Sequence, residues 1–410
     1  MEKIVLVDDD ADIRRVVELR LRLAGFQVLT ASDGEAGLQL IRAEKPRIAL
    51  LDLMMPRKHG FAVCQEIRSN PELRGTYIIV GSAKTYAPDI KKAKELGADA
   101  YLTKPYDFEA LIGTIQKALA SSGPPLKVRF WGTRGSIATP GAATLRYGGN
   151  TACTEVRCGD HVLLFDCGTG VREAGLALSQ EFQGRPLHVH IFVGHSHWDH
   201  IQGFPFFTPA YIPRNRISIY SLRGSDKSLE KIFTGQMDGS YFPVDLNDLK
   251  CELQFVELEG PVEIGEAKVS HVYLNHPGLA IGFRIDFGAK SVVYITDHEP
   301  YCRLSGDNDH NRKLDREIDE FARGAHLYVR EAQYTEEEYS SKRGWGHSTW
   351  KDALGSAHAA QARRLALYHH DPMRDDDAMD RILADCRAYM QERGMTFECM
   401  AAAESLELTL

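Results

Sequence analysis

Residues 193–200 carry four side chains of the types that bind metal ions, namely His195, His197, Asp199 and His200. A buried core has no reason to gather such groups, because each unpaired buried polar group costs several kcal/mol. His195 and His197 can offer two imidazoles to one metal, while Asp199 and His200 can serve a second metal nearby. The spacing therefore predicts a hydrolase that uses two metal ions.

The chain around this cluster indicates how it is held. Residues 188–193 are mostly apolar and are typical of a buried strand, and Gly203 and Pro205 interrupt the chain soon afterwards. The cluster therefore lies at the carboxyl end of a strand, where open α/β sheets hold their chemistry. The order His-x-His-x-Asp-His resembles the signature of the metallo-β-lactamase-fold hydrolases.

That resemblance implies further ligands at the ends of later strands. The implied ligand sets are His195, His197 and His276 for one metal, Asp199, His200 and His369 for the other, and Asp297 as a bridge between them. Either His369 or His370 could be the ligand. We favour His369, because it directly follows a strand. Asp166 occupies the family's first motif, where a carboxylate can orient an imidazole that binds the metal.

A second motif bears on the substrate. The segment Gly346-His347-Ser-Thr349, which follows a strand ending in Glu331, resembles a segment of ribonuclease Z and related phosphodiesterases. The resemblance implies that His347, paired with Glu331, assists departure of the leaving oxygen. The alternative is a loop histidine and a strand-end acid without a catalytic role, because Arg330 replaces the histidine of the family at that position.

Two further stretches are interpreted with alternatives left open. Arg134 is either a contact for the substrate phosphate or part of a structural salt bridge, and Gly148, Gly149 and Asn150 predict a turn near the metals. The aromatic-rich stretch 204–242 is expected to form a wall or lid of the pocket, where aromatic rings either stack on a base or pack in a core.

The first part of the chain follows a different pattern. Short apolar runs alternate with amphipathic stretches, which predicts five strand-helix units and a parallel sheet covered by helices on both faces. The predicted strands are 4–7, 27–30, 48–51, 77–80 and 100–102, and the predicted helices are 12–23, 34–42, 60–68, 90–96 and 107–120. Asp8, Asp9 and Asp52 lie at strand ends, where Mg²⁺ can relieve the repulsion among their carboxylates.

These residues resemble the receiver domains of bacterial response regulators. The resemblance implies that a sensor histidine kinase phosphorylates Asp52, with Asp8 and Asp9 holding Mg²⁺. It further implies a switch built from Ser82, Tyr101 and Lys104, a cis peptide bond before Pro105, and pairing of receivers as homodimers. Gly81, next to Ser82, departs from the family pattern and is expected to loosen the switch loop.

We therefore predict a receiver domain over residues 1–121, a short linker over 122–126 and a hydrolase domain over 127–410. The linker is too short to let the domains move far apart, so we expect them to touch. The resemblance assigns to the hydrolase domain a four-layer αββα sandwich with two mixed sheets. Its predicted strands are 127–131, 154–157, 161–165, 188–193, 217–220, 254–257, 269–273, 280–285, 291–296, 326–330 and 366–368, and its predicted helices are 170–178, 229–233, 318–322, 351–362 and 377–393.

Charge and composition narrow the function further. Residues 1–123 hold 18 of the 49 Lys and Arg and 17 of the 57 Asp and Glu, which leaves 31 basic against 40 acidic residues for the rest. An acidic hydrolase is a poor partner for a long polyanion, so we expect no direct DNA binding and favour a small or cyclic phosphodiester as substrate. No stretch is long and apolar enough for a membrane span, which predicts a cytoplasmic protein with reduced cysteines.

The hypothesis is thus a response regulator whose output is a metal-dependent phosphodiesterase controlled by phosphorylation. Zinc is the expected metal, with manganese or iron as alternatives. Two other functions stay open: hydrolysis of a carboxylic ester or thioester by the same centre, and a docking module that signals without catalysis.

Overall fold

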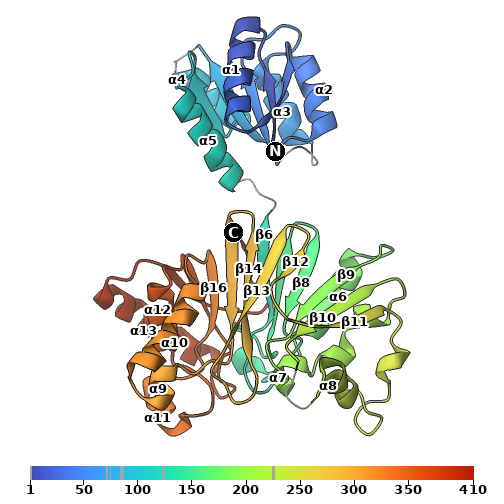
Figure 1. Cartoon of the computed structure of the whole chain (residues 1–410), viewed down its shortest axis with the longest axis vertical. Coiled ribbons are helices and arrows are strands. Elements are labelled where there is room, and N and C mark those ends of the chain that lie inside the picture. Colours follow the sequence, from blue (N-terminus) through green and yellow to red (C-terminus); the bar gives the residue numbers. More distant parts are fainter. Residues whose placement is uncertain (1, 71–72, 74, 84–86, 122–124, 224–226) are drawn as a thin grey trace. The chain divides into compact units, whose positions relative to one another are not determined.

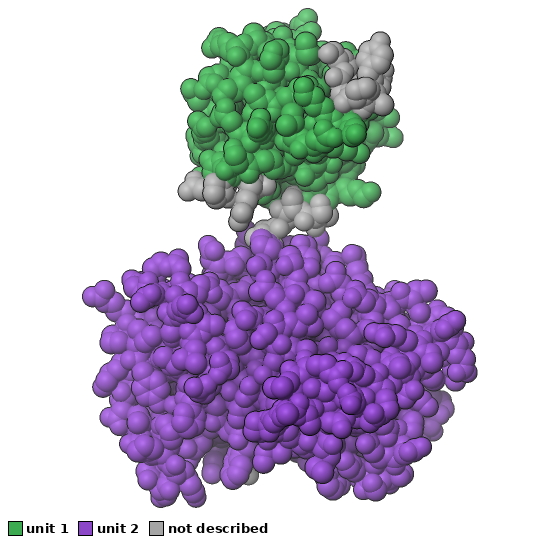
Figure 2. Space-filling view, turned by 180° about the vertical axis from the view of Figure 1, so that it is seen from behind, with its two compact units in different colours: residues 1–123 green, residues 124–410 purple. Residues whose placement is uncertain are grey.

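The computed structural model describes residues 2–70, 73, 75–83, 87–121, 125–223 and 227–410. The chain divides into two compact units, Met1–Gly123 and Pro124–Leu410, which are coloured separately in Figure 2. The first strand of the second unit begins at Leu126, inside the predicted linker, and residues 122–124 of that linker lie outside the described residues. Contact between the units stays a prediction.

The first unit is a parallel sheet in the order β2-β1-β3-β4-β5. Its strands are β1 (Lys3–Val7), β2 (Gln27–Ala31), β3 (Ile48–Asp52), β4 (Tyr77–Ser82) and β5 (Ala100–Thr103). Its helices are α1 (Ala11–Leu23), α2 (Gly34–Glu44), α3 (Gly60–Ser69), α4 (Ala87–Glu95) and α5 (Phe108–Ser121). The predicted strand-helix alternation is therefore confirmed.

Alternation of side chains along each strand gives this sheet two apolar faces. On β1, Ile4 and Leu6 pack with residues of α1 and α5, whereas Val5 and Val7 pack with residues of α2 and α3. A central parallel strand buried on both faces reads as a continuous apolar run, and β1 and β3 have that composition. Helices therefore cover both faces, as predicted.

The second unit contains two seven-stranded sheets. The first has the order β11-β10-β9-β8-β7-β6-β19, formed by β6 (Leu126–Gly132), β7 (Cys153–Cys158), β8 (His161–Phe165), β9 (His188–Phe192), β10 (Arg216–Ser221), β11 (Glu252–Glu257) and β19 (Glu407–Thr409). The second runs in sequence order through β12 (Val262–Ile264), β13 (Ala267–Tyr273), β14 (Ile281–Phe287), β15 (Lys290–Ile295), β16 (Leu327–Glu331), β17 (Arg364–Tyr368) and β18 (Glu398–Ala401). Each sheet combines antiparallel with parallel pairs, so both are mixed, as predicted.

Helices flank the two sheets on their outer faces (Figure 1). The longer elements are α6 (Val171–Glu181), α8 (Leu229–Gln236), α10 (Asp309–Phe321), α12 (Trp350–Ala359) and α13 (Asp376–Arg393). The shorter ones are α7 (Trp198–Ile201), α9 (Tyr301–Ser305), α11 (Glu336–Lys342) and the 3₁₀ turns η1 (Ala142–Thr144), η2 (Phe204–Phe206), η3 (Thr208–Tyr211) and η4 (Leu246–Asp248). One core lies between the sheets, a second joins α6 and α8 to the first sheet, and a third joins α10, α12 and α13 to the second. This is the four-layer αββα arrangement.

Candidate metal centre

The parallel strands of both sheets end at one rim of the sandwich, and the chemistry-bearing residues follow those ends. His195 and His197 follow β9, and Asp199 and His200 lie in α7 immediately after them. From the second sheet, Asp297 follows β15 and His369 follows β17, while His276 comes after the antiparallel strand β13. The fold thus joins residues from distant parts of the chain.

The predicted ligands form two groups that share Asp297. In each group the candidate ligand atoms lie within 4.8 Å of one another; the groups are His195, His197, His276 and Asp297, and Asp199, His200, His369 and Asp297. The structure therefore brings together every residue of the two sets implied by the sequence.

Asp297 lies between the two groups and turns one oxygen toward each. Its Oδ2 is 3.5 Å from Nε2 of His195 and 3.8 Å from Nε2 of His276. Its Oδ1 is 3.4 Å from Nε2 of His200 and 3.2 Å from Nε2 of His369. One carboxylate facing two sets of imidazoles is the geometry of a bridging ligand.

Unpartnered atoms test whether the residues fit metal ions. Nε2 of His195, Nε2 of His200 and Oδ1 of Asp297 are buried and have no hydrogen-bond partner in the described protein. Buried polar atoms are otherwise almost always satisfied, and a divalent cation would satisfy all three at once. The donor set of imidazoles and carboxylates therefore fits two divalent metals.

Neighbouring groups fix the orientation of three imidazoles. Asp166 Oδ2 is 2.7 Å from Nδ1 of His200, and the carbonyl of Gly346 is 3.0 Å from Nδ1 of His276. The side-chain oxygen of Gln333 is 3.0 Å from Nδ1 of His369. These oxygens accept a hydrogen bond from Nδ1 and leave Nε2 as the atom turned toward the other candidate ligands, which is how metal-binding histidines are usually held.

His370 is directed elsewhere. Its Nε2 donates to the carbonyl of Ala402 at 2.8 Å, and burial lowers its pKa to about 3. Of the adjacent histidines, only His369 turns its ring toward Asp199 and Asp297.

Three site residues adopt the left-handed backbone conformation, which side chains other than glycine rarely take. The φ angles of Asp166, Asp297 and His369 are +62°, +51° and +57°, and each follows the end of a strand. Such conformations cost about 1 to 3 kcal/mol each and persist where surrounding structure enforces them. The strain turns these side chains sharply into the site.

Charge within the cluster shifts several pKa values. Burial alone would lower the pKa of His200, but Asp199, Asp166 and Asp297 outweigh it and raise that pKa well above the ordinary value. Burial would raise the pKa of Asp297, yet His369, His200 and His195 hold it well below. The carboxylates of the cluster thus favour a protonated His200 when no metal is bound, a charge that metal ions would replace.

Glu299 anchors the loop beside His276 and was not predicted from the sequence. Its carboxylate is almost fully buried and accepts hydrogen bonds from the hydroxyl of Tyr339 at 2.6 Å and from the N–H groups of Gly344 and Gly346 at 2.9 and 3.0 Å. Gly346 has φ of +87°, and a Cβ there would lie 2.1 Å from Nδ1 of His276. Glu299 therefore holds the carbonyl that orients His276.

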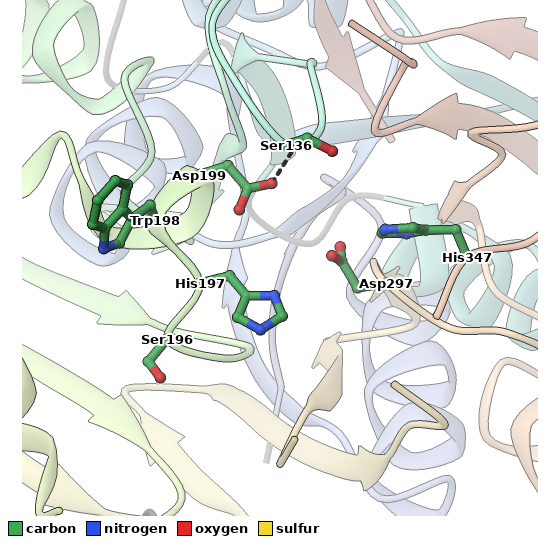
Figure 3. Close-up of a pocket in the computed structure, with 7 residues that line it drawn as sticks. All are labelled: Ser136, Ser196, His197, Trp198, Asp199, Asp297 and His347. Carbon is green, nitrogen blue, oxygen red and sulfur yellow. Dashed lines mark hydrogen bonds between the residues drawn. The ribbon is translucent and has the colours of Figure 1, made fainter. Parts of the chain in front are cut away.

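The expected pairing of His347 with Glu331 is wrong. The Glu331 carboxylate instead accepts from the N–H groups of Ser348 at 2.6 Å and Gln333 at 3.2 Å, which fixes the loop that carries His347. Burial raises the pKa of Glu331 to about 7. Nδ1 of His347 is buried without a partner, and its ring points toward Asp297 (Figure 3).

Arg134 forms no ion pair with a described residue, so the salt-bridge interpretation is wrong, and its contact with a substrate phosphate stays a prediction. Its guanidinium is fully buried and donates to the carbonyls of Gly148, Asp371 and Arg374 at 2.7, 3.2 and 2.7 Å. It therefore ties the turn at residues 148–150 to the segment after His369. The motif around Arg134 also supplies the N–H of Ser136, which donates to Asp199 Oδ2 at 2.7 Å.

A pocket of about 450 Å³ opens onto the cluster (Figure 3). Its lining includes His197, Asp199, Asp297, His347 and the exposed Trp198. A substrate can therefore reach both groups of candidate ligands and the His347 ring from one side.

The first unit has its own cluster at the carboxyl ends of its strands. Carboxylate oxygens of Asp8, Asp9 and Asp52 lie within 4.8 Å of one another. Nζ of Lys104 is 2.7 Å from Asp8 and 3.1 Å from Asp52, and the Lys104–Pro105 bond is cis, as predicted. This all-oxygen set fits Mg²⁺.

The switch candidates lie around this cluster. Ser82 is buried at the end of β4, where its carbonyl accepts from the N–H of Lys104, and Tyr101 is half-buried in β5. Gly81 lies within β4, and a Cβ there would lie 1.8 Å from the hydroxyl of Tyr106. Close packing against Tyr106 therefore favours glycine here, and the expected loosening of the switch loop stays a prediction.

Each of the two units matches a known protein family. Residues 4–116 match the response regulator receiver domain family, and residues 161–370, just over half of the chain, match the family described as beta-lactamase superfamily domain. The chain therefore belongs to the beta-lactamase superfamily and carries a response regulator receiver domain at its amino terminus.

Three similar proteins illustrate the match. Protein PilG of Pseudomonas aeruginosa is 38% identical over 122 residues, which are 30% of this chain and 90% of PilG. The probable transcriptional regulator ycf27 of Porphyridium aerugineum is 41% identical over 118 residues, 29% of this chain and 48% of ycf27, so the chain spans about half the length of such curated relatives. The structure of human tRNase Z, short form, is 19% identical with a TM-score of 0.46, covering 69% of this chain and 98% of that one.

Among the described residues, no helix has the length and hydropathy needed to cross a bilayer.

Proposed function

We propose that the second unit is a two-metal phosphodiesterase and that phosphorylation of Asp52 in the first unit controls it. The observation that carries the proposal is Asp297, which turns one oxygen toward each of two groups of candidate ligands; within each group the ligand atoms lie within 4.8 Å of one another. Imidazole with carboxylate suits zinc, and manganese or iron are the alternatives.

When bound, two divalent cations would supply the Lewis acidity that activates water and neutralises charge on a phosphodiester. The protein would position them through Asp166, Gly346 and Gln333, which hold the imidazoles of His200, His276 and His369. Asp199 is held in turn by the N–H of Ser136. These contacts fix the donor atoms before a cation arrives, which lowers the cost of binding it.

We propose that His347 donates a proton to the leaving oxygen. Its Nδ1 is buried without a partner and its ring borders the pocket, within reach of a substrate that lies on Asp297. Burial lowers the pKa of His347 to about 3, so the ring is neutral at pH 7 until a negatively charged substrate favours its protonation. Glu331 acts only by holding the adjacent backbone.

Substrates with graded leaving groups test this assignment. Loss of a general acid slows departure of a poor leaving group more than departure of a good one. We expect His347→Asn to reduce kcat about 10²-fold or more for an alkyl leaving group, and much less for p-nitrophenolate. An equal reduction for both would show that His347 only positions the substrate.

In the first unit, Asp52 would accept a phosphoryl group from a cognate sensor histidine kinase, with Mg²⁺ held by Asp8 and Asp9. Lys104, which contacts Asp52, would neutralise part of the added charge. Ser82 and Tyr101 would then respond to that charge.

The direct test is hydrolysis of bis(p-nitrophenyl) phosphate by zinc- or manganese-loaded protein, with and without beryllofluoride as the phosphoryl mimic. The proposal predicts turnover that is lost in Asp199→Ala and that changes with beryllofluoride only when Asp52 is intact. No turnover with metal demonstrably bound would favour a carbonyl substrate, which ester and thioester assays would detect. Signalling that needs Asp52 but survives Asp199→Ala would favour docking without catalysis.

A further inference from the structure

A second cavity continues from the metal centre. This groove has a volume of about 900 Å³ and is lined in part by His195, Ser196 and Trp198, two of which also line the pocket over the metal centre. It extends along α8 toward Tyr241. Its volume lies in the range of small-molecule sites, roughly 300 to 1,000 Å³. The groove can therefore hold the non-reacting part of a substrate whose reacting group lies at the metal centre.

Aromatic rings line this groove without being covered by other residues. Trp198, Phe206 and Tyr241 are 80%, 56% and 83% exposed. The Phe206 ring meets the Phe242 ring edge to face at 5.3 Å between centroids, which fixes it while leaving it open. Clustered exposed aromatic residues commonly mark a binding surface, and flat rings of this kind stack on nucleobases.

The described part of the groove also carries positive charge. Lys227 and Lys231 line it, and no Asp or Glu does so among the residues the structure describes. Neither lysine forms an ion pair with a described residue, although the second unit as a whole is acidic. A cationic patch on an acidic protein selects an anion, and a phosphate group satisfies that requirement.

We propose that this aromatic groove binds a nucleobase followed by a second phosphate, so that the preferred substrate is a dinucleotide-type phosphodiester. The inference rests on the proposed phosphodiesterase function. The reacting phosphodiester would lie over Asp297, its nucleoside against Trp198 and Tyr241, and the second phosphate at Lys231. A small aryl diester or a mononucleotide lacks one of these contacts.

Matched substrates separate the two contacts. We would compare thymidylyl-thymidine with and without a terminal phosphate, and with an abasic counterpart, using the metal-loaded full chain. We expect wild type to prefer the phosphorylated and the base-bearing substrates at least tenfold in kcat/KM. Tyr241→Ala should lower the preference for the base at least tenfold, and Lys227→Gln with Lys231→Gln should lower the preference for the phosphate at least fivefold.

Lys250→Gln is the matched control, because Lys250 is exposed and is not part of the groove. It should keep both ratios of kcat/KM. Binding can also be measured without catalysis, by calorimetric titration of the metal-free full chain with the phosphorylated dinucleotide. We expect both groove variants to bind this dinucleotide at least tenfold more weakly than wild type does.

The outcomes distinguish the two proposals. If the metal-loaded wild type hydrolyses neither the dinucleotides nor bis(p-nitrophenyl) phosphate, the proposed function fails. If it hydrolyses bis(p-nitrophenyl) phosphate but shows no preference within either substrate pair, or if the groove variants keep the wild-type ratios, the groove inference alone is overturned.

Discussion

The two clusters of acidic residues in this chain solve the same electrostatic problem in different ways. Both lie at strand ends, and both crowd carboxylates that repel one another. In the first unit, Lys104 is an internal counter-ion that contacts Asp8 and Asp52. In the second, no described lysine or arginine forms an ion pair with Asp199 or Asp297, whose ion-pair partners are imidazoles.

The difference teaches what each site requires. A carboxylate cluster with a lysine is compensated before Mg²⁺ or a phosphoryl group arrives, which suits the filling and emptying that the proposed phosphorylation requires. A cluster in which Nε2 of His195 and Nε2 of His200 lack a hydrogen-bond partner is completed by cations that accept nitrogen donors. This difference supports the proposal that the first site switches and that the second keeps its metals.

The largest expected effect comes from Asp199→Ala. The carboxylate of Asp199 lies 3.2 Å from His369 Nε2 and 3.4 Å from His200 Nε2, so its loss leaves one metal with two imidazoles and the shared Asp297. We expect kcat for bis(p-nitrophenyl) phosphate to fall about 10³-fold or more. Asp309→Ala, at a fully exposed carboxylate, is the control. Full activity in Asp199→Ala would show that the imidazole cluster is not the reaction centre.

Lys104→Met tests the internal counter-ion. The variant leaves Asp8 buried beside Asp52 without a cation, which we expect to destabilise the first unit by about 3 kcal/mol. Hydrogen exchange of β1 and β3 would measure this loss, and added Mg²⁺ should recover part of it. Exposed Lys91→Met is the control. Unchanged exchange would mean that the carboxylates need no counter-ion.

Glu299→Gln tests whether the loop beside His276 is preset. The amide can no longer accept from Tyr339, Gly344 and Gly346 together, so the carbonyl that orients His276 should move. We expect metal affinity to fall about 10- to 100-fold in competition with a chelator. The Nδ1–H resonance of His276 should broaden as well, whereas exposed Glu266→Gln should change neither quantity. Wild-type affinity in Glu299→Gln would show that the metals alone orient His276.

The smallest expected effect concerns Asp319, a buried carboxyl group that has no lysine partner among the described residues and belongs to neither candidate metal site. Burial raises the pKa of Asp319 to about 6, so the folded protein holds this proton more tightly than the unfolded chain does. The contribution of Asp319 to the free energy of unfolding is therefore most favourable below about pH 4, and it is lost as pH rises from about 4 to 6. We expect Asp319→Asn to stabilise the second unit by about 1 kcal/mol at pH 7, and to remove that dependence in urea unfolding. A variant no more stable at pH 7 than wild type would refute this.

Local patterns were sufficient to predict much of the architecture. The cluster from His195 to His200 is contiguous in sequence, and the five strand-helix units repeat with clear apolar periodicity. The strands β18 and β19 were not predicted, because the polar and small residues of that segment pair with β17 and β6 only through long-range contacts.

The contacts around the site were harder to predict for a physical reason. Glu299 lies two residues after Asp297, but its partners come from residues 339–346, and no local spacing indicates that loop. Glu331 was assigned to His347 because the segment resembles that of ribonuclease Z, whereas the folded backbone offers N–H groups that donate to the same carboxylate. The charge of Arg134 suggested an anionic partner, yet its guanidinium donates to backbone carbonyls.

Native mass spectrometry of the zinc-loaded full chain tests the central claim most directly. The shared Asp297 and the two groups of ligands predict two zinc ions for each chain, and predict that His276→Ala retains only one firmly. A wild-type chain that binds a single zinc ion or none, at zinc concentrations that saturate other zinc hydrolases, would contradict the account.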